Sequence, residues 1–451
     1  MDLTESLVAA FRAHYPDSAP PRVCRAPGRV NLIGEHMDYN GLPVLPMAME
    51  EAIYMAFAPR ADGRVHIANM DTQYPVLAFD NAPALAPSPP GSWDNYVKAA
   101  VSGLNAYFET DASVGMNILV DSTLRTAEGL SSSSALVVAS ALAYLACLDK
   151  ELGDAITKLE LADLLASAEQ FVGTRGGGMD QAVILCGEQG CAAKIDFYPL
   201  RLEHVPVPED HALFVCSSLV RVEKSGEALH RFNMMPASCR LLAAIVNQEV
   251  QRQFGEEVMI DRLGDLWLGP LCLTYDEAEE IINAALPHPL TTLEEAADIL
   301  GMDAESLRGQ YFGDIPVPAE GLPLQARARH LRTEFRRVET ARDALLAGDA
   351  EAFAAQMNAS HTSCRNDFFI SSEQLDTLVG AARKAGALGA RLTGAGFGGC
   401  TVNLVPLEKA GAFPLAVEEA YYRDYLGASA GGNGAIRRAR SGAGAGYIAT
   451  A

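Results

Sequence analysis

The stretch GRVNLIGEHMDYNG, residues 28–41, concentrates groups that can do chemistry next to apolar sequence. Arg29, Glu35, His36 and Asp38 supply a guanidinium, two carboxylates and an imidazole, and the apolar run VLPMAM follows directly. Polar groups placed this close to a core cost free energy unless they are paired or bind something. We therefore treat these four residues as candidates for a functional site.

A second candidate is the run EGLSSSSAL, residues 128–136, because four serines open a long apolar segment. A helix N-terminus presents unpaired N–H groups and a partial positive charge, so it binds anions. Serine hydroxyls add donors, or a ligand for a phosphate-bound Mg²⁺. One serine would suffice for capping, so we favour an anion site over simple capping. The sequence lacks GxxxxGK[ST], which excludes a P-loop of that type.

Two other glycine-rich loops accompany these motifs. GTRGGGMDQ, residues 173–181, allows close backbone approach at Gly177 and is followed by Asp180. GAGFGG, residues 394–399, formally matches G-x-G-x-x-G, but the strand-like run CTVNLV follows where a dinucleotide site needs a helix. We therefore interpret it as a loop between two strands with its backbone near a ligand; a plain hairpin is the alternative.

Periodicity predicts the elements that must carry these loops. Strands are expected within 22–80 and at 115–124, 211–218, 390–396, 401–407 and 446–450. Helices are expected at 93–108, 131–148, 158–173, 292–300 and 375–387. The chain becomes β-rich again after residue 180, and we place a domain boundary near 205. An acidic, loop-rich insertion with helical pieces is expected at about 253–325.

Composition limits the possible functions. With 451 residues and 49% apolar side chains, the chain can bury an ample core. Its net charge of -22 argues against general binding to nucleic acid or to an anionic membrane. We find no signal peptide and no apolar run long enough to span a membrane. Nine scattered cysteines without a CxxC pair favour reduced thiols and a cytoplasmic location, and we expect a monomer.

Together the motifs resemble the GHMP small-molecule kinases and, among them, the galactokinase branch. GRVNLIGEHMDYNG resembles the sugar-binding signature of that branch, GLSSSSA its phosphate-binding motif and LTGAGFGGC its C-terminal glycine motif. The resemblance implies an α+β fold with an S5-like N-terminal domain (1–205), a ferredoxin-like C-terminal domain (206–451) and an active site in the cleft between them. It also implies an ATP-dependent sugar 1-kinase.

The resemblance assigns the catalytic roles. Asp180 would accept or orient the proton of the sugar C1 hydroxyl, and Arg29 would lie beside it, keep it ionised and offset charge on the transferred phosphoryl group. The substrate-binding residues would be Glu35, His36, Asp38, Gly177 and Phe232.

The resemblance also places the nucleotide and the metal. ATP would lie with its phosphates on the helix N-terminus, and Ser133 and Glu169 would contact Mg²⁺. The nucleotide-binding residues would be Gly129, Ser131, Ser132, Ser133, Ser134, Gly394 and Gly396. From the sequence alone, an exposed helix position is an equally good reading of Glu169. Glu128, next to the phosphates, is expected to point outward.

The sugar stays open at this stage. GTRGGGMDQ and SHTSCRNDFF resemble N-acetylgalactosamine kinases most closely, yet fungal galactokinases share the paired glycines. Phe232 lacks the hydroxyl of the tyrosine that galactokinases tend to carry, which favours an N-acetylated sugar, and Met235 replaces a usual arginine. An inactive sugar sensor ranks below an enzyme because the serine run and Asp180 are intact. A mevalonate or homoserine kinase ranks low because those kinases lack the Glu-His-x-Asp-Tyr run.

Overall fold

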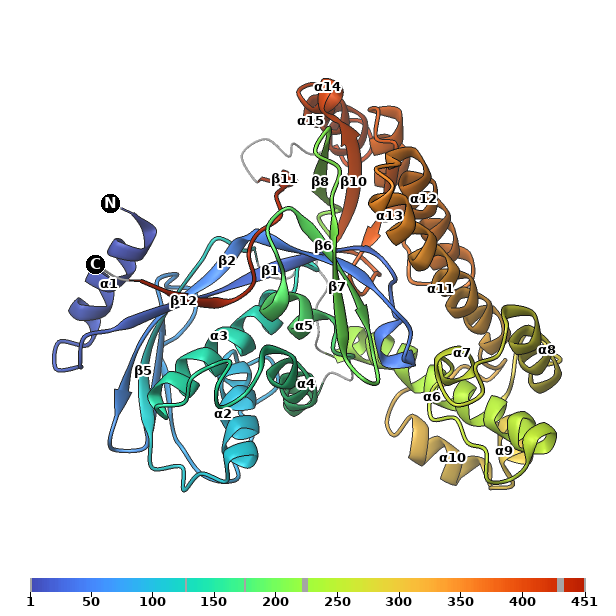
Figure 1. Ribbon diagram of the computed structural model, residues 1–451, viewed down its shortest axis with the longest axis horizontal. Coiled ribbons are helices and arrows are strands. Elements are labelled where there is room, and N and C mark those ends of the chain that lie inside the picture. Colours follow the sequence, from blue (N-terminus) through green and yellow to red (C-terminus); the bar gives the residue numbers. More distant parts are fainter. Residues whose placement is uncertain (1, 126–127, 174–175, 221–225, 428–433, 450–451) are drawn as a thin grey trace.

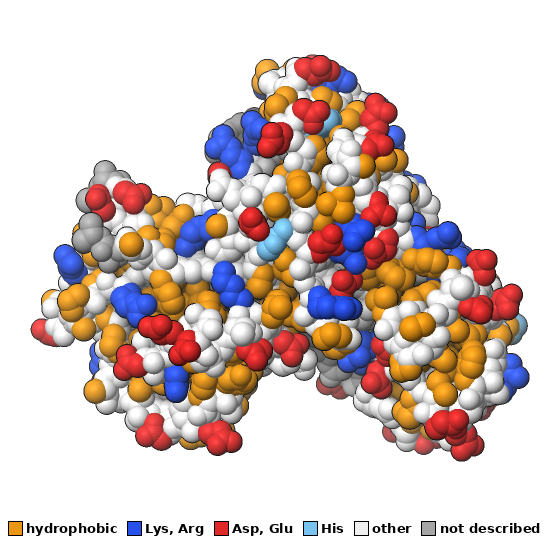
Figure 2. All heavy atoms as spheres, in the orientation of Figure 1, with side chains coloured by type: hydrophobic (Ala, Val, Ile, Leu, Met, Phe, Trp, Pro, Cys, Tyr) orange, Lys and Arg blue, Asp and Glu red, His pale blue; other side chains and the backbone are white. Residues whose placement is uncertain are grey.

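The computed structural model describes residues 2–125, 128–173, 176–220, 226–427 and 434–449 (Figure 1). A first sheet with its helices, a second sheet with its helices and a helical lobe meet at the centre of the molecule. The fold class is therefore α+β, as predicted. Figure 2 shows the molecular outline indented between the part that contains α2–α4 and the helical lobe.

The first sheet has the strand order β12-β1-β2-β5-β3-β4, antiparallel except for the parallel pair β3 and β5. Its strands are β1 (Arg22–Ile33), β2 (Leu45–Arg60), β3 (Arg64–Asn69), β4 (Leu77–Asp80), β5 (Gly115–Ser122) and β12 (Gly446–Ile448). A hairpin of β6 (Cys191–Asp196) and β7 (Arg201–Pro206) joins it through a bridge between Val44 and Ile195.

Helices cover this sheet because apolar side chains line both of its faces. They are α1 (Leu3–His14), α2 (Asp94–Phe108), α3 (Ser132–Cys147), α4 (Lys158–Ala168) and α5 (Met179–Cys186). Helix α3 is apolar on nearly all sides, as expected of a helix that packs between other elements. Helix α1 instead buries Leu7 and Phe11 in a separate core that includes Val23 and Leu119. The predicted helices at 93–108 and 131–148 are confirmed.

The second sheet has the order β11-β8-β10-β9, antiparallel throughout. Its strands are β8 (His211–Ser217), β9 (Gly389–Thr393), β10 (Cys400–Pro406) and β11 (Ile436–Ala439). Along β8, Val215 packs with α12 (Ala350–Asn366) on one face, and Phe214 packs with α13 (Glu373–Lys384) on the other. Beyond β10 lie α14 (Leu407–Ala410), α15 (Phe413–Val417) and a π-helix (Glu418–Arg423).

The helical lobe occupies the lower right of Figure 1. It consists of α6 (Gly226–Phe254), α7 (Asp265–Leu268), α8 (Tyr275–Ala285), α9 (Leu293–Leu300) and α10 (Ala304–Tyr311), and the long helix α11 (Leu324–Leu346) runs from it to lie beside α12. Helices α8 and α9 begin at Thr274 and Thr292, each in a capping box with a glutamate three residues later. The insertion expected at 253–325 therefore contains α7–α10, and α9 matches the helix predicted at 292–300.

The chain passes from one sheet to the other between Pro206 and His211, close to the boundary expected near 205. A single boundary does not describe the end of the chain, because β12 returns to pair with β1 of the first sheet. The core around Val30 and Met47 also includes residues of α11, α12 and the second sheet. The parts are therefore joined by shared packing. None of the helices in the described ranges has both the length and the apolarity needed to cross a bilayer.

Candidate active site

Arg29 and Asp180 form a two-point ion pair at the centre of the molecule. Arg29 comes from β1 and Asp180 from the first turn of α5. Arg29 Nε and Nη2 donate to the two carboxylate oxygens of Asp180 at 2.7 and 3.2 Å, and Arg29 Nη1 donates to the Gly129 carbonyl at 2.7 Å. The Arg29 side chain is 7% exposed and that of Asp180 22%. Three motifs that are far apart in the sequence therefore meet at one guanidinium.

The four serines divide into inward and outward pairs at the start of α3. Ser131 donates to the Asp180 carboxylate, and Ser134 donates to Glu169 at 2.9 Å. Ser132 and Ser133 occupy the first turn of the helix and are partly exposed. The inward pair fixes the carboxylates, and the outward pair leaves hydroxyls and helix N–H groups available for an anion.

Asp38 faces the same region from a 3-10 turn, Asp38–Asn40, and is 8% exposed. It accepts a hydrogen bond from the Met179 N–H at 3.4 Å. A Cβ on Gly177 would lie 2.3 Å from the Asp38 Cγ, so a glycine is required there. Burial, followed by the charge of nearby Asp180, raises the pKa of Asp38 to about 6. Two carboxylates thus share a poorly solvated space.

Glu35 lies deeper than the expected sugar rim, because only 1% of it is exposed. Its carboxylate accepts hydrogen bonds from Asn31 Nδ2 at 2.6 Å, Arg391 Nη1 at 3.1 Å and the Gly394 N–H at 2.8 Å. The last two donors belong to β9 and the loop after it. Glu35 therefore fastens the second sheet to the signature stretch, and its sugar contact stays a prediction.

His36 connects the same two regions through its ring. Nδ1 lies 2.9 Å from the Tyr39 hydroxyl and Nε2 lies 3.2 Å from the Ala395 carbonyl. A carbonyl only accepts, so Nε2 carries the proton and Nδ1 accepts from Tyr39. Burial lowers the pKa of His36 to about 3, which keeps the ring neutral. The ring also packs against Phe368, with centroids 4.9 Å apart.

The C-terminal glycine motif packs directly on the phosphate-loop motif. A Cβ on Gly394 would lie 2.9 Å from the Gly129 carbonyl oxygen, so both backbones can approach only because the side chain is missing. A Cβ on Gly396 would lie still closer, 2.3 Å from the Ile370 carbonyl oxygen. Thr393, just before the motif, exchanges hydrogen bonds with the backbone of Asn31. The two domains thus close around the Arg29–Asp180 pair.

The structure places Phe232 on α6, near the glycine loop that precedes Asp180. Its neighbour Asn233 donates to the Gly173 carbonyl at 3.1 Å. Phe232 is partly buried, and the contact of its ring with a sugar stays a prediction. Met235, in the position of the usual arginine, is 6% exposed and belongs to the hydrophobic core.

Sequence reasoning missed two arginines that complete the site. Arg391 is fully buried in β9 against Glu35, and Arg437 of β11 donates to Glu128 at 2.6 Å. The expectation that Glu128 points outward is therefore wrong: its side chain is only 15% exposed, because Arg437 neutralises its charge beside the serine loop. A charged residue inside the apolar run ARLTG was the available signal for Arg391.

The oxygen atoms at and around Glu169 are suitable ligands for Mg²⁺. They are carboxylate and hydroxyl oxygens, which Mg²⁺ prefers, and Gln181 also donates to Glu169. In the described part of the chain, no group of three or more His, Cys, Asp or Glu side chains could hold a metal alone. Mg²⁺ is commonly held by one or two carboxylates together with substrate phosphates. The Ser133 contact to the metal stays a prediction.

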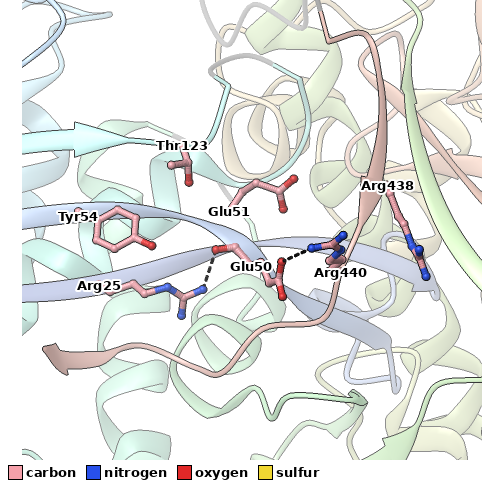
Figure 3. Close-up of a pocket in the computed structure, with 7 residues that line it drawn as sticks. All are labelled: Arg25, Glu50, Glu51, Tyr54, Thr123, Arg438 and Arg440. Carbon is pink, nitrogen blue, oxygen red and sulfur yellow. Dashed lines mark hydrogen bonds and ion pairs between the residues drawn. The ribbon is translucent and has the colours of Figure 1, made fainter. Parts of the chain in front are cut away.

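Of two hollows in the described structure, only the second reaches the motif residues. One, of about 630 Å³, is lined by Arg25, Glu50, Glu51, Tyr54, Thr123, Arg438 and Arg440 (Figure 3). It contains none of the motif residues. The other, of about 410 Å³, lies between α4, the 197–200 turn and Gly176–Gly178, so it adjoins the wall that Gly177 forms with Asp38.

Family models match three segments of the chain. Residues 9–59 match the galactokinase galactose-binding signature, residues 95–188 the N-terminal domain of GHMP kinases and residues 341–423 their C-terminal domain. Together these segments include Arg29, the serine run and Asp180. The glycine motif at 394–399 falls in the third segment.

Named relatives agree with the family models. A galactokinase of Dictyostelium discoideum is 33% identical over 94% of this chain and 88% of its own length. One of Chloroflexus aurantiacus is 34% identical over 92% of both chains.

Solved structures show the same fold. Lactococcus lactis galactokinase complexed with galactose superposes with a TM-score of 0.77 at 27% identity, over 99% of this chain and all of that one. A mevalonate kinase at 16% identity has a TM-score of 0.55 over 93% of this chain and 99% of its own, which supports the fold alone. The chain belongs to the galactokinase family of GHMP kinases and is a sugar kinase that uses ATP with Mg²⁺.

Proposed function

We propose that this enzyme transfers the γ-phosphoryl group of ATP to the C1 hydroxyl of galactose. The observation that carries the proposal is the Arg29–Asp180 pair beside the N-terminus of α3, with Asp38 on the adjoining wall. The names of the relatives and the galactose complex of the Lactococcus lactis enzyme support this choice of sugar.

Asp180 is the proposed proton acceptor. An anomeric hydroxyl is too weak an acid to ionise unaided near neutral pH, so a carboxylate that accepts or orients its proton speeds the transfer. Arg29 holds both oxygens of that carboxylate and offsets charge on the transferred group. Ser131, which donates to the same carboxylate, helps to fix its orientation.

The phosphates are proposed to lie on the first turn of α3. There they meet the helix N–H groups and the partly exposed hydroxyls of Ser132 and Ser133, while the backbones of Gly129 and Gly394 close the loop behind. Ser133 and Glu169 would hold Mg²⁺, which neutralises phosphate charge and orients the γ-phosphoryl group when bound. Ser134 and Gln181 hold the Glu169 carboxylate in place.

Sugar hydroxyls are proposed to bind Asp38 and the backbone at Gly177, with His36, Glu35 and Phe232 around them. A carboxylate accepts from two adjacent hydroxyls, which suits Asp38. Near pH 6 this role competes with protonation, because the pKa of Asp38 is raised to about 6 by burial.

N-acetylgalactosamine is a second candidate, which the hollow of about 410 Å³ beside Gly177 favours. The carbon next to C1 is C2, and the hollow adjoins the loop that leads into Asp180 at C1. Phe197 and Tyr198 give it an apolar side, and Ser167 and Gln170 offer hydrogen bonds. Such a mixed lining fits an acetamido group better than a hydroxyl.

A coupled assay of ATP turnover tests the proposal. The sugars are galactose, N-acetylgalactosamine, glucose, N-acetylglucosamine, arabinose and galacturonate. We expect turnover with galactose, and a comparable or higher rate with N-acetylgalactosamine would make that sugar the substrate. Sugar binding without any turnover would instead indicate a sensor and would contradict the proposal.

We also propose that the enzyme works as a monomer in the cytoplasm. Its nine cysteines all lie in described positions and all are free thiols, which suits a reducing compartment that supplies ATP. Light scattering of the purified protein checks the monomer, and a mass of twice 48.0 kDa would contradict it.

A further inference from the structure

Arg327 on α11 is a buried cation without an ion-pair partner in the described part of the chain. It is 4% exposed, and its Nε and Nη1 are buried without hydrogen-bond partners. Two other arginines, one buried and one partly buried, differ in this respect. Arg391 pairs with Glu35 at 3.1 Å, and Arg337, on the same helix, pairs with Glu334 at 2.6 Å.

The described groups that face Arg327 carry no compensating charge. Tyr39 and Cys239 are the ionisable groups that interact with it most strongly. Burial raises the pKa of the Cys239 thiol and holds the pKa of the Tyr39 hydroxyl well above its usual range, so both stay neutral. A buried, unpaired charge lowers stability, and an apolar residue of similar volume would cost less. A charge kept at such a cost next to the signature stretch suggests a functional reason.

The hydrogen-bond chain that starts at Tyr39 provides that reason. The Tyr39 hydroxyl donates to His36 Nδ1, and His36 Nε2 donates to the Ala395 carbonyl inside the glycine motif. In this direction the hydrogen of the hydroxyl points to His36 and its lone pairs point elsewhere. A cation close to the hydroxyl favours lone pairs turned towards it, and it also disfavours a protonated His36.

We propose that Arg327 is a positioning residue whose charge orients the Tyr39–His36–Ala395 chain and so holds the glycine motif against the sugar-binding stretch. The inference rests on the proposed function only in that the sugar binds beside Asp38 and His36. Arg327 acts through Tyr39 and touches neither substrate nor phosphate.

Replacing Arg327 by methionine separates this role from a structural one. We expect Arg327→Met to keep or raise Tm, because it removes an uncompensated buried charge. We expect kcat/KM for the sugar to fall roughly tenfold to a hundredfold, as a misplaced binding wall does, with KM for ATP within about twofold of the parent. Arg327→Lys, which keeps the charge, should recover part of the loss.

A control variant on the same helix is expected to change Tm in the opposite direction. Arg337→Met leaves the buried carboxylate of Glu334 without its cation, so its Tm should fall. A fall of similar size in Arg327→Met, with sugar and ATP constants worsening together, would show that Arg327 is only structural and would overturn the proposal.

A double-mutant cycle tests the route through Tyr39. If Arg327 acts on the hydroxyl, Arg327→Met should have no further effect on sugar kcat/KM in a Tyr39→Phe background. Full additivity would overturn the proposal, as would an unchanged sugar kcat/KM in the single variant. All ratios use the sugar that the parent enzyme turns over best. If the parent enzyme phosphorylates another sugar, only the choice of galactose is contradicted and the proposal for Arg327 is not. The comparison of Tm values requires no sugar.

Discussion

The proposed phosphate end and the proposed sugar end of the candidate site are built in different ways. At the proposed phosphate end, all the partners come from residues 29–181: Arg29 and Ser131 donate to Asp180, and Ser134 donates to Glu169. At the proposed sugar end, the hydrogen-bond partners come from a distant part of the chain. His36 bonds to the Ala395 carbonyl, and Glu35 accepts hydrogen bonds from the Gly394 N–H and from Arg391.

One end of the site is organised within a single region of the chain, whereas the other forms only when distant regions pack together. The polar side chains of the proposed phosphate end come from β1, α3, α5 and the 3-10 helix Glu169–Val172, and from the second half of the chain the Gly394 backbone packs on Gly129. The sugar end needs β9, α11 and the glycine motif to dock on the signature stretch, and buried charges carry that docking. We therefore expect changes at the phosphate end to affect turnover first, and changes at the sugar end to affect stability together with sugar binding.

The largest expected effect is on turnover at the phosphate end. Asp180→Asn should lower kcat by about 10³ to 10⁴, because it removes the proton acceptor but keeps the size of the side chain. Titration calorimetry should show ATP affinity within about twofold of the parent. Asp180→Ala should likewise abolish sugar phosphorylation while ATP still binds. Near-normal turnover in either variant would rule out Asp180 as the base.

The next effect is on stability at the sugar end. Arg391→Met should lower the free energy of unfolding by about 3–5 kcal/mol, because Glu35 would remain buried without its cation. Urea unfolding measures the change. The double variant with Glu35→Gln should be more stable than Arg391→Met alone, since the uncompensated carboxylate is gone. Equal stability of the two would show that the pair does not join the domains.

Asp38 should show a pH-dependent effect of somewhat smaller size. Its pKa is raised from 3.8 to about 6, so the folded state holds a proton that the unfolded chain releases. The stability it contributes is present below about pH 4 and is lost as pH rises through 6. Asp38→Asn should therefore raise the free energy of unfolding by about 3 kcal/mol at pH 8 and much less near pH 4.

The same variant should bind sugar more weakly, which distinguishes a functional carboxylate from a structural one. We expect KM for the sugar to rise at least roughly tenfold in Asp38→Asn. Thermal melts from pH 4.5 to 8 and sugar titrations check both parts. A variant that is less stable than the parent at pH 8 would contradict the raised pKa.

The smallest expected effect concerns the metal. Ser133→Ala should raise the Mg²⁺ concentration needed for half-maximal rate by about tenfold, equal to about 1.4 kcal/mol. Ser132→Ala, its neighbour on the same turn, should raise KM for ATP without changing that metal dependence. Magnesium titrations at saturating ATP separate the two. Equal metal dependence in both variants would remove Ser133 from the metal site.

Local patterns predicted most of the elements that carry the phosphate end. The apolar run after the serines predicts α3 because a helix buried between other elements is apolar on nearly all sides. The strand after GAGFGG is confirmed as β10, which supports the rejection of a dinucleotide site. The return of β12 to β1 follows from long-range pairing, so the last run predicted a strand but not its partner.

Buried partners at the sugar end were not predictable in the same way. Arg391 is one charged residue in an apolar strand, and Arg327 lies among several arginines in RARHLRTEFRR. Nothing in that helical pattern marks which arginine faces inward to Tyr39 and Cys239. The same holds for Glu334, which accepts from the Gly34 N–H at 3.0 Å.

The sequence by itself determined the chemistry of this protein. It contains a guanidinium, a candidate base carboxylate and a helix that opens with serines, because each of these needs only a residue type in a short local pattern. The tertiary structure alone decided that Glu35 faces Arg391, that Gly177 lies against Asp38 and that Arg327 has no counter-ion among the described residues. The physical reason is that these contacts depend on which side chains are buried and on which distant segments of the chain approach one another. A short stretch of sequence specifies neither.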